Sequence, residues 1–91
     1  VRSGYLWCVM LQDPSLPGPA VAFAIGRPFG SAVRRNRVRR QLRSILSDRE
    51  SVMGGGMFLI GVNNPHRDLP MPSFAQLTHD VDEILSKGRR R

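Results

Sequence analysis

The chain has 91 residues, of which 41% are hydrophobic, and a formal net charge of +7 at pH 7. This length allows one small domain, and the hydrophobic fraction is too high for a disordered chain. The longest apolar runs are much shorter than a membrane span. The arginine-rich stretch also lacks the bulky aromatic anchors of a membrane-surface helix, so we expect no membrane partner. Cys8 is the single cysteine, which excludes an intrachain disulfide and suits a reducing cytoplasm.

Two strands are predicted in the first third of the chain. Residues 4–11 are rich in aromatic and β-branched side chains, and residues 20–26 alternate bulky side chains with alanines. The segment between them, 12–19, holds three prolines and is predicted as a loop. Because this connection is short, we expect the two strands to pair as an antiparallel hairpin.

A helix is predicted from Ala32 to about Ser47, with Ser31 as its N-cap. After a glycine break at 54–56, the continuous apolar run 57–62 predicts an inner strand. The predicted apolar stripe of the helix consists of Val38, Leu42, Ile45 and Leu46.

A second helix is predicted after Ser73, which forms a capping box with Gln76. The helix is amphipathic, so one face is expected in the core and the acidic face in solvent. The expected core residues are Phe74, Leu77, Val81, Ile84 and Leu85, and the expected solvated residues are Asp80, Asp82 and Glu83.

The order strand, strand, helix, strand, helix predicts an α+β fold of the split β-α-β sandwich type. In it, helices pack on a small, mostly antiparallel sheet. We expect residues 1–88 to form a single domain, and 89–91 to be a disordered basic tail.

The positive charge is concentrated at the start of the first predicted helix. Six arginines lie between Arg34 and Arg43, with no acidic residue among them. Cations at a helix N-terminus are unfavourable by roughly 0.3–1 kcal/mol each, and like-charge pairs such as Arg35 and Arg39 add about 0.2–0.5 kcal/mol. A phosphate backbone explains the arrangement, because helix amides and guanidinium groups then bind the same anion. Thirteen of the 14 basic residues are Arg, which also favours phosphate binding.

The sequence contains few residues that could catalyse a reaction. Its carboxylates are dispersed, so none of its motifs predicts a Mg²⁺ site, and no Walker-type loop occurs. His66 and His79 are interpreted as surface residues rather than general bases. We therefore predict no catalytic residue and no metal ligand.

Residues 29–43, FGSAVRRNRVRRQLR, resemble the signature of the bacterial ribonuclease P protein subunit. In that family a glycine, an Ala-Val pair and an Arg-Asn-Arg core open the basic helix, and the order of elements agrees over nearly the whole chain. Family members often have a serine and two lysines before the glycine, where this chain has Gly26, Arg27 and Pro28. The family's helix before the first strand is absent, and the chain begins with Val1 rather than Met, so we expect it to be shortened at its N-terminus.

The resemblance implies a partnership with a large catalytic RNA that removes the 5′ leader from precursor tRNA. The RNA would perform the Mg²⁺-dependent hydrolysis, so the protein's side chains alone would bind no cofactor. The protein would bind this RNA through the basic helix and hold the leader between helix and sheet. The RNA-binding candidates are Arg27, Ser31, Arg34, Arg35, Asn36, Arg37, Arg39, Arg40 and Arg43.

Aromatic residues on strands can stack single-stranded bases, with each base worth about 1–3 kcal/mol. The leader-binding candidates are Tyr5, Trp7, Val9 and Phe23, with core packing as the alternative for the three aromatics. A dimer is a further expectation, since a sheet face that lacks its usual helix can bind a second copy.

Two other classes stay open. An RNA-binding module such as a ribosomal protein of similar split fold would use the same basic helix on a static RNA. A helix-turn-helix DNA-binding regulator needs a helix directly before the recognition helix, whereas residues 20–26 are predicted as a strand.

Overall fold

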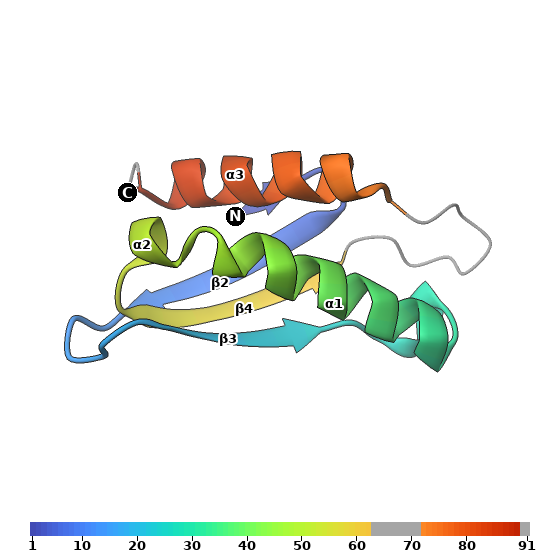
Figure 1. Ribbon diagram of the computed structural model, residues 1–91, viewed down its shortest axis with the longest axis horizontal. Helices are drawn as coiled ribbons and strands as arrows, with labels where there is room; N and C mark the ends of the chain where they lie inside the picture. Colours follow the sequence, from blue (N-terminus) through green and yellow to red (C-terminus); the bar gives the residue numbers. More distant parts are fainter. Residues whose placement is uncertain (63–71, 90–91) are drawn as a thin grey trace.

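The computed structural model describes residues 1–62 and 72–89, in which helices cover one face of a four-stranded sheet (Figure 1). None of the described helices has both the length and the apolar character needed to cross a bilayer. The strands are β1 (Arg2–Ser3), β2 (Leu6–Gln12), β3 (Pro19–Ala24) and β4 (Gly56–Val62). The helices are η1 (Arg27–Phe29, a 3₁₀ turn), α1 (Ala32–Ser47), α2 (Glu50–Met53) and α3 (Phe74–Arg89).

The sheet has the order β1-β2-β4-β3, so the predicted hairpin between the first two long strands is wrong. β4 lies between them, antiparallel to β2 and parallel to β3. The physical reason is that β4 is apolar on both faces. Phe58 and Ile60 are buried on one face, and Met57 and Leu59 are exposed on the other. Such a strand suits the centre of a sheet. The predicted α+β class is confirmed, and two of the three strand pairings are antiparallel.

The core lies between the sheet and the helices α1 and α3. From the sheet it takes alternate residues of β2 and β4, such as Leu6 and Ile60. The predicted stripe of α1 is confirmed, since all four of its residues are buried. Four of the five predicted core residues of α3 are also buried: Leu77, Val81, Ile84 and Leu85.

Phe74 departs from the predicted core, because 48% of it is exposed. It is the first residue of α3, where no preceding helical turn packs around the ring. The capping box beside it is confirmed. The Ser73 Oγ accepts the Gln76 N–H at 3.1 Å, and the Gln76 side chain accepts the Ser73 N–H at 2.9 Å.

Asp80 was expected in solvent but is buried, with 5% of its surface exposed. Its carboxylate accepts a hydrogen bond from the Tyr5 backbone N–H at 2.9 Å, and the Ser3 hydroxyl lies 3.5 Å away. The turn between β1 and β2 leaves that amide without a strand partner. Asp80 therefore satisfies a partly buried donor and links the start of the chain to α3.

Three short elements and one helix end were not predicted. α2 has four residues, η1 has three and β1 has two, lengths too short to show a periodic pattern. α3 continues to Arg89, the first residue of the expected basic tail, while residues 90–91 lie outside the described part of the chain. Residues 63–71, which include His66, also lie outside it.

Candidate nucleic-acid interface

The basic helix α1 begins with a side-chain cap, as predicted. Ser31 is extended, with φ −64° and ψ 166°, and its Oγ accepts the Arg34 backbone N–H at 3.3 Å. The first turn of α1 contains no acidic residue. Its remaining N-terminal amides and the arginines therefore present positive charge in the same region.

Arg34 is positioned by its neighbours at the start of α1. Its guanidinium carbon lies 5.3 Å from the centre of the Phe29 ring, a cation–π distance, and Phe29 is buried. The Arg34 side chain passes over Gly30, where a Cβ would lie 2.6 Å from its Cδ. The φ of Gly30 is 144°, a value that favours glycine. Glycine at position 30 therefore allows the chain to turn into α1 beneath the Arg34 side chain.

Further along α1, the arginines form a row held by short-range contacts. The Asn36 side chain accepts a hydrogen bond from Arg39 at 3.0 Å. The Arg43 guanidinium carbon lies 5.8 Å from the centre of the Phe23 ring on β3. Arg37 and Arg40 are exposed. These contacts orient the row without neutralising its charge.

The described carboxylates do not neutralise this row. None of Arg35, Arg37, Arg39, Arg40 and Arg43 forms an ion pair with a carboxylate in the part of the chain that the structure describes. The ion pairs found there lie elsewhere and join Arg49 to Asp82, His79 to Glu83 and Lys87 to Glu83.

The arginines at the start of α1 are arranged against the helix dipole. They lie in the first turn, where a cation destabilises a helix slightly. At the other end Asp48 is the C-cap, and its charge is offset by the Arg49 guanidinium, which donates to the Ile45 carbonyl at 3.1 Å. The buried Nε of Arg35 also finds no hydrogen-bond acceptor among residues 1–62 and 72–89. An external anion would relieve these costs, and folding alone gives no reason for them.

The predicted RNA-binding residues lie together in one continuous segment. Arg27 is exposed in η1, Ser31 caps α1, and the other seven lie on α1 between Arg34 and Arg43. Arg34, Arg35 and Arg39 are partly buried, and the rest are exposed. The segment therefore offers one basic surface, which we call the α1 basic surface.

The sheet face that the helices leave uncovered is apolar. Val9 and Leu11 on β2 are 60% and 64% exposed, and Met57 on β4 is 53% exposed. A shallow hollow of about 320 Å³ lies among them and the alanines of β3. Trp7 lies on the same face of β2 as Val9, directly opposite Gly61 of β4. We call this the open sheet face.

Only two of the four leader-binding candidates come together. Trp7 and Val9 share the open sheet face. Phe23 pairs with Ile60, a core residue, and lies on the helix side of the sheet. Tyr5 lies in the turn between β1 and β2. Sequence reasoning also missed Gly61, which a correct pairing of β2 with β4 would have placed beside Trp7.

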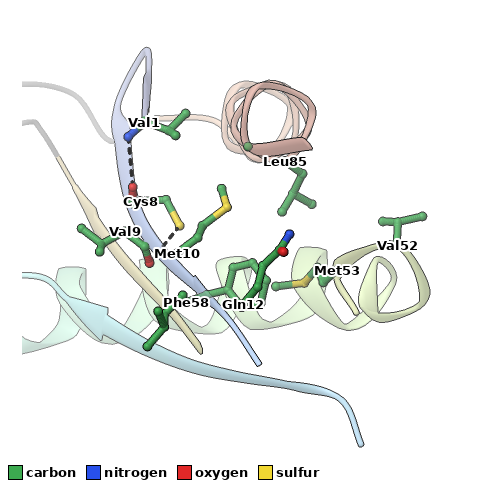
Figure 2. Close-up of a pocket in the computed structure, with 11 residues that line it drawn as sticks. Val1, Cys8, Val9, Met10, Gln12, Val52, Met53, Phe58 and Leu85 are labelled. Atoms are coloured by element: carbon green, nitrogen blue, oxygen red, sulfur yellow. Dashed lines mark hydrogen bonds between the residues drawn. The ribbon is translucent and has the colours of Figure 1, made fainter. Parts of the chain in front are cut away.

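A cavity of about 370 Å³ lies on the helix side of the sheet, and no arginine of the α1 basic surface lines it. Figure 2 shows Met10, Met53 and Leu85 pointing into it, with Cys8 on its wall. Burial raises the pKa of the Cys8 thiol to about 11, so the thiol is protonated at neutral pH. Among the described residues, no cluster of three His, Cys, Asp or Glu side chains is placed to hold a metal ion.

The family model described as Ribonuclease P matches residues 1–89 of this chain. The chain belongs to the Ribonuclease P family. It is 37% identical over 79 residues to the "Ribonuclease P protein component" of Acidothermus cellulolyticus, covering 84% of this chain and 62% of that protein. It is 31% identical over 83 residues to the protein of the same name from Streptomyces avermitilis, covering 82% and 63%. The chain thus spans less than two thirds of the length of these Ribonuclease P relatives.

Solved structures of this family share the fold. The RNase P protein of Staphylococcus aureus aligns with a TM-score of 0.81 at 15% identity, over 98% of this chain and 79% of that one. The RNase P protein of Thermotoga maritima aligns with a TM-score of 0.81 at 17% identity, over 96% and 80%. At these identities the likeness concerns the fold alone.

Proposed function

We propose that the chain is the protein subunit of a bacterial ribonuclease P, which binds the catalytic RNA and assists removal of the 5′ leader from precursor tRNA. The observation that supports this most is the α1 basic surface. Five of its arginines form no ion pair with a carboxylate among the described residues, namely Arg35, Arg37, Arg39, Arg40 and Arg43. Guanidinium groups bind phosphate through paired hydrogen bonds, and several of them together bind the phosphates of an RNA backbone. Family membership selects ribonuclease P RNA as the partner.

In this proposal the catalysis belongs to the RNA. The RNA holds the Mg²⁺ ions that activate the attacking water, and the protein supplies positive charge and binding surface. The contribution of α1 is electrostatic. By lowering repulsion between RNA phosphates, its arginines reduce the Mg²⁺ concentration that the folded RNA requires. We place this work in the cytoplasm, where the Cys8 thiol stays reduced.

The leader is proposed to bind the open sheet face. Trp7 offers a ring for stacking, and Val9 and Leu11 offer apolar contact on the same face. The small side chains of Ala22 and Ala24 allow a strand of RNA to approach the sheet closely. A dimer through this face would compete with the leader, so light scattering with and without leader RNA separates these two uses.

A reconstitution experiment tests the proposal. The full-length protein is added to a bacterial ribonuclease P RNA and precursor tRNA, and cleavage is followed while Mg²⁺ is lowered. We expect the protein to shift the Mg²⁺ midpoint to lower concentration. If cleavage at low Mg²⁺ is unchanged by the protein, the proposed function is wrong, and a static RNA-binding module becomes the better explanation.

A further inference from the structure

A second groove, separate from the open sheet face, lies between the free edge of the sheet and the helices. Its volume is about 310 Å³. β3 is the edge strand, so one side of its backbone has no partner in the described sheet. We call this hollow the edge groove. Its apolar lining includes Val21 and Phe23 from β3, Leu46 from α1 and Met53 from α2.

Two opposite charges line the edge groove. Arg43 belongs to the α1 basic surface and lies over the Phe23 ring. Glu50 is exposed at the start of α2, and its carboxylate accepts no hydrogen bond and forms no ion pair within the described residues. No ion pair joins Arg43 to Glu50 either. The groove therefore offers an aromatic surface, a cation and an acceptor, none of which neutralises another.

We infer that the edge groove binds one unpaired guanosine of an RNA partner, an inference that rests on the proposed function. The base would pack against Phe23 and the apolar lining, and its phosphate would meet Arg43. Guanine carries two adjacent donors, N1–H and N2–H, which match the two oxygens of the Glu50 carboxylate. Unpaired bases are read in this way, by stacking on aromatic rings and hydrogen bonding of their Watson–Crick edge.

Because of Glu50, we expect the groove to bind the base of a nucleotide rather than the phosphate backbone. A carboxylate repels phosphate, so a backbone lying along the groove would gain at Arg43 and lose at Glu50. Uracil presents one N–H between two carbonyl oxygens, and those oxygens would face the carboxylate unfavourably. Adenine and cytosine each have only their amino group as a hydrogen-bond donor on this edge, beside ring atoms that accept. Guanine is the base whose donors satisfy the groove.

Nucleotide titrations of the full-length protein, followed by amide chemical shifts in NMR, test the recognition step. Guanosine 5′-monophosphate is expected to shift the amides of Phe23, Ser47 and Glu50, and to bind about tenfold more tightly than uridine 5′-monophosphate. Glu50→Gln should remove this preference. Asp48→Asn is the matched control, because it removes the same charge from an exposed carboxylate outside the groove. Equal binding of the two nucleotides, or equal effects of the two substitutions, would overturn the inference.

Footprinting with kethoxal, which reacts with N1 and N2 of unpaired guanine, identifies the source of the guanosine. In the complex with ribonuclease P RNA and precursor tRNA, one guanosine should be protected by wild-type protein but not by Glu50→Gln. The position of the protected guanosine, in the catalytic RNA or in the leader, shows which of the two RNAs binds the edge groove. If the protein lowers the Mg²⁺ requirement yet no Glu50-dependent protection appears in either strand, the guanosine site is wrong while the proposed function stands.

Discussion

Trp7 occupies the space in which a side chain at position 61 would lie. The two residues are directly opposite each other on β2 and β4, and a Cβ added to Gly61 would overlap Cε2 and Cζ2 of the indole. Glycine there lets the ring rest on the sheet, where it is half-buried and still reaches solvent. This relationship places an aromatic surface on the open sheet face.

Replacing Gly61 should move the indole. Gly61→Ala is expected to destabilise the fold by about 1–3 kcal/mol, because an added methyl in a packed site forces its neighbours aside. The emission maximum of Trp7, the only tryptophan in the chain, should shift as well. Urea unfolding and fluorescence measure the two effects. Gly18→Ala is the control, since nothing lies within 4 Å of its added Cβ, and an equal loss in both variants would contradict the packing.

Asp80 should contribute more to stability than its acidic neighbour on α3. Asp80→Ala leaves the Tyr5 N–H without its acceptor, at a cost of about 1–3 kcal/mol. Asp82→Ala removes an exposed ion pair with Arg49 and should cost no more than about 1 kcal/mol. Chemical denaturation of both variants gives the comparison. The account of Asp80 fails if the Asp80 variant is the less destabilised of the two.

The elements that the sequence could predict are those with a local signal. The cap at Ser31, the capping box of Ser73 and the apolar stripe of α1 depend on residues within one or two turns, and the structure confirms them. The RNA-binding candidates share this advantage, because residues 27–43 are continuous in the chain and lie on η1, α1 and the cap between them. Their roles stay predictions.

What the sequence could not predict depends on which strands pair. A short loop suggested a hairpin, yet β4 enters between β2 and β3 from more than thirty positions away. That insertion sets Gly61 beside Trp7 and leaves β3 at the edge, where the groove with Glu50 forms. The burial of Asp80 follows from the turn at Tyr5, a contact across 75 positions that periodicity does not report.

Cys8 should react slowly with thiol reagents in the folded protein. Its pKa is raised from 9.0 to about 11 by burial, which leaves about a hundredfold less thiolate than in the unfolded chain at the same pH. At pH 8, modification by a disulfide reagent should therefore accelerate strongly when urea unfolds the protein. A rate that stays unchanged across the unfolding transition would show that the thiol is accessible and ionised in the fold.

The Arg49–Asp82 ion pair should weaken in acid. The hydrogen bond from Arg49 holds the pKa of Asp82 below its ordinary value of 3.8, so the unfolded chain takes up this proton first as pH falls. The pair's stabilisation is therefore present at pH 5 and above, and is lost as pH falls from about 4 through the lowered pKa. Asp82 is half-exposed, so the contribution is below about 1 kcal/mol.

Unfolding free energies of wild type and Asp82→Asn between pH 7 and pH 3 measure this contribution. The difference should favour wild type near neutrality and shrink toward zero in acid. A difference that grows as pH falls has the wrong sign and would contradict the assignment. Glu50→Gln is a suitable control, since Glu50 forms no ion pair with a described residue.

The salt dependence of RNA binding tests the central claim most directly, namely that the arginines of α1 bind phosphate. Affinity for ribonuclease P RNA is measured against salt concentration for wild type, Arg35→Ala/Arg37→Ala, and a control of equal charge loss, Arg2→Ala/Lys87→Ala, from outside α1. We predict that the α1 variant binds more weakly and that its log–log slope is shallower by about 1 to 2, while the control keeps the wild-type slope. An unchanged slope in the α1 variant would contradict the account.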